Sequence, residues 1–67
     1  MSEKPYIIFI KSEDVKSIRF FKINNRTSTI QIEQEDMTLK YNVHNRSIPE
    51  IYTQLITSKF IFIDLIN

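Results

Sequence analysis

The sequence predicts an α+β fold: a small antiparallel β-meander or half-barrel of about five strands, with one main amphipathic helix near residues 48–58. Five segments rich in β-branched and aromatic residues are separated by short polar stretches, the pattern of strands joined by turns. One further segment has its apolar residues at helical spacing. The 67 residues fit one domain, 1–67, which is expected to bury only about 60% of its unfolded surface.

The first two predicted strands are apolar on both faces. "PYIIFI", residues 5–10, is β-branched and aromatic throughout, and polar residues end it. "KSIRFFKI", residues 16–23, alternates so that Ile18 and Phe20 lie on one face while Phe21 and Ile23 lie on the other. Neither strand therefore has a purely polar outer side.

The next two strands are half-exposed. "NNRTS", residues 24–28, is a turn by residue type, because asparagine can take over the role of glycine: it tolerates positive φ angles and bonds to nearby backbone groups. "STIQIEQE" and "TLKYNV", residues 28–35 and 38–43, alternate apolar and polar residues, as antiparallel strands with one solvated face do. Asp36 and Met37 form the tight turn between them.

The helix has several start signals. Ser47 followed by Glu50 fits a capping box, and Pro49 lies in the first turn, where its missing N–H costs nothing. The apolar stripe is expected to pack on one face of the sheet. It consists of Ile48, Ile51, Tyr52, Leu55 and Ile56.

The tail, residues 59–66, is apolar on both faces of a strand and also fits a short buried helix, and its β-propensity favours a strand. Three of five strands then have two apolar faces, whereas one short helix covers only one face of a sheet. The apolar strand surface that the helix cannot cover predicts contacts with a protein partner. The chain is expected either to self-associate as a homo-oligomer or to dock on a larger protein as a regulator or inhibitor. Candidate self-association residues, of which about half are expected in the core and the rest against a partner chain, are Tyr6, Phe9, Phe60 and Phe62.

The composition excludes several other functions. With no cysteine and one histidine, the chain lacks the ligands for disulfides or a structural zinc site. It also has no glycine, which phosphate-binding loops need for close backbone approach. We expect His44 to lie in an exposed loop and Glu33, Glu35 and Asp36 to form a solvated turn. The sequence therefore predicts a protein that is not an enzyme, with no cofactor, metal or small-molecule substrate.

The N-terminal stretch has five consecutive apolar residues followed by charge, which is not the pattern of a secretory signal. No apolar run approaches the ~20 residues of a membrane-spanning helix. We therefore expect a cytoplasmic protein with no membrane partner. Thirteen isoleucines with many lysines and asparagines indicate an AT-rich coding sequence, such as that of a bacterium or phage.

The stretch "KSIRFFKI" has two interpretations. A strand that alternates basic and aromatic residues is typical of sheets that stack bases and hold phosphates. The net charge of +1 instead favours an ordinary core strand fringed by solvated charge. An RNA- or DNA-binding module is accordingly the alternative function. Its candidate interaction surface is Arg19, Phe21, Lys22, Arg26, Lys40 and Arg46.

Residues 12–55 resemble the KTSC domain family, a small module found alone or at the C-terminus of some lysyl-tRNA synthetases. The resemblance lies in "SEDVKSIRF", in the alternating "STIQIE", in "TLKYNV" with its tyrosine, and in "SIPEIYTQLITS" as a proline-containing helix start followed by Tyr and Leu. It covers about two thirds of the chain. It implies a compact β-rich domain with one main helix, no established catalytic activity, and an association with RNA or translation components.

Overall fold

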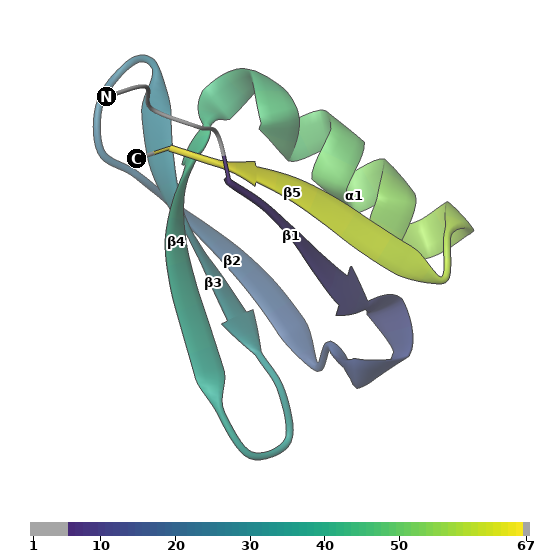
Figure 1. Cartoon of the computed structure of the whole chain (residues 1–67). Coiled ribbons are helices and arrows are strands. Elements are labelled where there is room, and N and C mark those ends of the chain that lie inside the picture. Colours follow the sequence, from purple (N-terminus) through teal and green to yellow (C-terminus); the bar gives the residue numbers. More distant parts are fainter. Residues whose placement is uncertain (1–5, 67) are drawn as a thin grey trace.

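The computed structural model describes residues 6–66, and it confirms the α+β architecture (Figure 1). Its regular elements are β1 (Tyr6–Lys11), β2 (Ser17–Lys22), β3 (Thr27–Glu33), β4 (Thr38–His44), α1 (Ile48–Thr57) and β5 (Phe60–Leu65). Two 3₁₀ turns that the sequence did not predict, Ser12–Asp14 and Asn45–Ser47, join β1 to β2 and β4 to α1. The tail is a strand, as its β-propensity favoured.

The strands form two antiparallel sheets. One has the order β2-β3-β4 and the other pairs β1 with β5. The sheets meet where the amide of Ile66, just after β5, donates to the carbonyl of Asn42 in β4 at 2.9 Å. Figure 1 shows α1 lying along β5, on the far side of that strand from β1.

The core lies where the inner faces of the two sheets and α1 meet. Each strand contributes alternate residues, because successive side chains of a strand point to opposite faces. In β3, for example, Ile30 and Ile32 are fully buried while Gln31 between them is partly exposed. The buried apolar residues are Ile10, Ile30, Ile32, Val43, Ile51, Ile61 and Ile63. The core is thus made of β-branched side chains that pack well on pleated surfaces.

The start of α1 differs from the prediction. Ser47 has helical backbone angles and makes no side-chain capping bond, so the capping box with Glu50 is wrong. The reason is that the chain enters α1 directly from the 3₁₀ turn Asn45–Ser47, whereas a capping residue needs an extended backbone. Pro49 lies in the first turn, as predicted.

The apolar stripe of α1 is also narrower than predicted. Ile51 is buried, but Ile56 is 82% exposed. Five positions along a helix correspond to about 140° of rotation, which turns Ile56 away from the core side that Ile51 faces. Tyr52 lies at the margin, with its ring 5.3 Å from that of Phe20 in β2.

The turn between β2 and β3 is closed by asparagine side chains and not by positive φ angles, which no described residue has. Asn24 Oδ1 accepts from the backbone amides of Arg26 and Thr27 at 2.8 and 2.9 Å. The side-chain amide of Asn45 donates to the Asn24 carbonyl at 3.1 Å, and Asn45 Oδ1 accepts from the hydroxyl of the buried Ser28. This network, which we call the asparagine network, ties the β2–β3 turn to the segment that follows β4.

Replacing Asn24 with alanine is expected to destabilise the protein by about 1–2 kcal/mol, because two backbone amides of the turn lose their acceptor. Urea unfolding followed by circular dichroism measures this cost. Asn25→Ala is the matched control, since no side-chain hydrogen bond of the described residues involves Asn25. Equal destabilisation by both variants would contradict the proposed role of Asn24.

Candidate interaction surfaces

The outer side of the two-stranded sheet is apolar. The register pairs Phe9 with Phe62, Lys11 with Phe60, and Ile7 with Asp64. Ile7, Phe9, Phe60 and Phe62 therefore share one side, which we call the β1–β5 face, with Lys11 and Asp64 at its corners. The four side chains are 54%, 68%, 46% and 54% exposed, respectively. The rings of Phe9 and Phe62 touch, with centroids 4.8 Å apart.

The backbone of β5 explains this close ring contact. The amide of Phe62 donates to Gln54 Oε1 at 3.1 Å, and its carbonyl accepts from Gln54 Nε2 at 3.0 Å. Since these groups point toward α1, Phe9 and Phe62 are a non-hydrogen-bonded pair, the kind in which opposed side chains lie closest. The backbone groups of Phe9 then point to the other edge of β1. Among the described strands, β1 pairs with β5 alone.

Three of the four predicted self-association residues are thus brought together. Phe9, Phe60 and Phe62 lie on one surface and none of them is in the core, so the expectation that about half of the set would be buried is wrong. The core side chains of these strands are instead the isoleucines of the other parity. The side chain of Tyr6 lies outside the described residues. Ile7 was missed, although it has the same strand parity as Phe9.

The apolar part of this face is large for so small a protein. A phenylalanine side chain has roughly 200 Å² to bury, and each of the three here is about half exposed. With Ile7, the face presents roughly 400 Å² of contiguous apolar surface. The largest apolar patch on a typical monomeric protein measures about 300–600 Å² and is often functional.

The outer side of the three-stranded sheet is polar, with several basic residues and one carboxylate, Glu33. Its register places Arg19, Gln31 and Lys40 in one row, and Phe21, Thr29 and Asn42 in the next. Arg19, Phe21 and Lys40 are exposed. We call this side the β2–β3–β4 face. The predicted member Lys22 does not belong to it, because Lys22 has the parity of Phe20 and of the inner side.

The other two predicted basic residues lie beyond the end of this face. Arg26 and Arg46 line a hollow of about 420 Å³ together with Asn25, His44 and Asn45. We call it the basic hollow. His44 is the last residue of β4 and is partly buried, rather than an exposed loop residue as predicted. The asparagine network described above holds the two sides of the hollow together.

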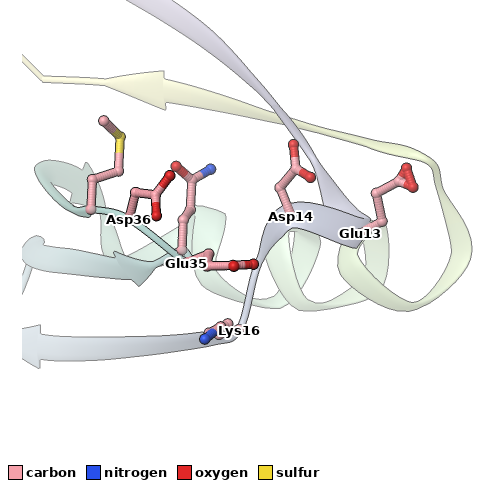
Figure 2. Close-up of a pocket in the computed structure, with 7 residues that line it drawn as sticks. Glu13, Asp14, Lys16, Glu35 and Asp36 are labelled. Carbon is pink, nitrogen blue, oxygen red and sulfur yellow. The ribbon is translucent and has the colours of Figure 1, made fainter.

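Acidic residues gather at the opposite end of the three-stranded sheet. Glu13 and Asp14, from the turn after β1, and Glu35 and Asp36, from the turn after β3, line one hollow of about 420 Å³ (Figure 2). Lys16 also lines it. Glu33 lies apart from this group and accepts from the Ser17 hydroxyl at 2.7 Å. Among residues 7–66, no group of three or more acidic or histidine side chains is arranged to hold a metal ion.

Comparisons with protein-family models, with curated proteins and with solved structures give no match for this chain. The similarity to the KTSC family therefore stays a prediction from the residue pattern. In the part of the chain that the structure describes, no helix has the length and apolar character to cross a membrane.

Proposed function

We propose that this chain is a non-enzymatic protein-binding module that works as a homodimer through the β1–β5 face. The supporting observation is that Phe9, Phe60 and Phe62 form one exposed, contiguous surface on the outer side of a well-packed sheet. A monomer gains nothing from leaving three phenylalanines in water. Covering them stabilises an assembly by roughly 25 cal/mol for each Å² of apolar surface buried.

The size of the surface suits a second copy. Two faces of roughly 400 Å² bury about 800 Å² of apolar surface, and polar atoms at the rim bring the total near the ~1,000 Å² expected of a specific interface. A chain of this length also has a small core, to which dimerisation adds buried area.

Two copies of the β1–β5 face have complementary charges. Lys11 is opposite Phe60 and Asp64 is opposite Ile7, so the two charged residues occupy diagonal corners around the central Phe9–Phe62 pair. Consider a two-fold axis that passes through the Phe9–Phe62 pair, lies in the plane of the interface and is perpendicular to the line from Lys11 to Asp64. This axis places Lys11 of each copy over Asp64 of the other. Such an isologous contact closes after two subunits.

Size-exclusion chromatography with light scattering tests the homodimer. We expect the wild type at twice the 8.1 kDa chain mass and Phe62→Ser at the monomer mass, because the substitution removes an aromatic anchor from the centre of the face. Phe21→Ser is the matched control, since Phe21 is 50% exposed on the other sheet and its loss should leave the dimer intact. A wild type that is monomeric at all accessible concentrations contradicts the homodimer.

Reversing the corner charges should change the dimer affinity in a pairwise manner. Lys11→Asp places two acids at each corner and is expected to weaken the dimer several-fold to about 30-fold, since rim charge pairs contribute up to about 1 kcal/mol each and occur twice. The double variant Lys11→Asp with Asp64→Lys is expected to regain most of the affinity. Sedimentation equilibrium at low salt measures both. Equal weakening by the single and double variants argues against the two-fold arrangement.

A further inference from the structure

The β2–β3–β4 face and the basic hollow adjoin each other. His44 belongs to both, because its parity places it on the outer side of β4 and it also lines the hollow. The paired residues that include Arg19 and those that include His44 are two rows apart on this face, and neighbouring rows are separated by roughly 7 Å along the strands. Moving along the sheet therefore leads from Arg19 and Lys40, past Phe21, to Arg26 and Arg46.

The surface between Arg19 and Arg46 carries positively charged side chains with hydrogen-bonding side chains between them. Thr29, Gln31 and Asn42 lie between the basic residues and Phe21. No acidic side chain lines the basic hollow in the described part of the chain. Glu33 has the parity of the same face and lies one row beyond Arg19 and Lys40, and the carboxylates of Glu13, Asp14, Glu35 and Asp36 line the hollow at that end of the sheet. The net charge of +1 thus includes a local pair of arginines, Arg26 and Arg46, at one end of the sheet.

The basic hollow is also held in shape before any ligand arrives. Its two walls come from different parts of the chain, and the backbone amide of Asn45 donates to the Arg26 carbonyl at 2.8 Å. Asn45 further bridges to Asn24 and to Ser28. Arg26 and Arg46 therefore start from fixed backbone positions, which reduces the entropy lost when both bind one anion.

We propose that Arg26, His44 and Arg46 form a phosphate-binding site at the end of a face on which Phe21 stacks a base, and that the ligand is a single-stranded nucleic acid. Arginine pairs with phosphate through two parallel hydrogen bonds, and Arg19 and Lys40 offer further phosphate contacts. Phe21 is half exposed beside them and provides a stacking surface that accepts any base. This inference concerns other strands than the dimer face and stands independently of the homodimer.

Fluorescence anisotropy with a labelled oligodeoxythymidine of about 12 nucleotides tests the site, a length within the range that small sheet modules cover. We expect binding at ~50 mM salt that weakens steeply towards ~200 mM. Arg26→Gln with Arg46→Gln should reduce the slope of log affinity against log salt by about 1.4, since each phosphate contact with a single strand contributes about 0.7. Lys16→Gln with Lys59→Gln is the control, because this double variant removes the same number of positive charges at positions that lie away from the face.

The stacking role has its own variants. Phe21→Ala should weaken binding about 5- to 150-fold, whereas Phe21→Tyr should bind as the wild type does. Phe21→Leu keeps an apolar side chain without a ring and should also weaken binding. Met37→Ala removes an exposed apolar residue at the acidic end and should have no effect.

Three results would overturn the inference. They are the absence of oligonucleotide binding at ~50 mM salt, an equal loss in the control pair of lysine variants, and binding of inorganic phosphate without any binding of the oligonucleotide.

Discussion

Replacing Ile30 with alanine is expected to remove about half of the folding stability at 25 °C. Ile30 is fully buried in β3, the central strand of its sheet, and truncating such a residue costs about 2–5 kcal/mol. A domain of this size has a total stability of roughly 3–10 kcal/mol. One substitution therefore removes about half of that stability. Urea unfolding monitored by circular dichroism, at constant protein concentration, measures the loss.

Ile56→Ala is the matched control for this loss. It deletes the same atoms from a side chain that is 82% exposed on α1, so its expected effect on the free energy of unfolding is within about 0.5 kcal/mol of zero. If the two variants were equally destabilised, the burial that separates these isoleucines would not be the source of stability.

The second large effect is expected at Gln54. Gln54→Ala removes both side-chain bonds to the backbone of Phe62 and should cost about 1–3 kcal/mol, because a donor and an acceptor of β5 lose their partners together. The matched control is Thr53→Ala, since the Thr53 hydroxyl bonds only to the Pro49 carbonyl within α1. Chemical denaturation gives the difference between the two variants.

Amide hydrogen exchange adds a local readout for Gln54. In the wild type the Phe62 amide is protected by Gln54 Oε1, and it should exchange much faster in Gln54→Ala. The amide of Ile63 faces the opposite edge of β5, toward β1, and should keep its protection relative to global unfolding. If both amides lost protection alike, the effect would be a general loosening of β5 and not the loss of one specific contact.

Local sequence pattern predicted the elements of the fold well. The two-residue alternation in β3 and β4 identified Ile30, Ile32 and Val43 as inward residues, and all three are buried. The helical spacing after Pro49 located α1 to within one residue of its end. These features follow from the period of each element and need no knowledge of tertiary contacts.

What the pattern could not supply was the arrangement in space. The division into two sheets depends on the pairing of β1 with β5, which are far apart in the chain. The 3₁₀ turn Asn45–Ser47 displaced the predicted capping box, because its geometry follows from how β4 meets α1. Lys22 was placed on the wrong side of its strand by charge alone, although its alternation with Phe21 contained the correct answer.

For the candidate surfaces too, the sequence pattern identified residues but not their arrangement in space. Phe9, Phe60 and Phe62 were recognised as surplus apolar residues, but only the register shows that they meet on one face. Ile7 could have been added from its parity with Phe9. The union of Arg26, His44 and Arg46 in one hollow depends on the asparagine network between distant segments, which no local pattern reveals.

The pairing of β1 with β5 also has a consequence for biosynthesis. Lys11 finds its partner in Phe60, about fifty positions later, so the two-stranded sheet cannot form on the ribosome until nearly the whole domain has been translated. During that interval β1, which has apolar side chains on both faces, has no strand to pair with. Nascent chains should therefore depend on chaperones that cover this segment, more than a helical protein of equal length would.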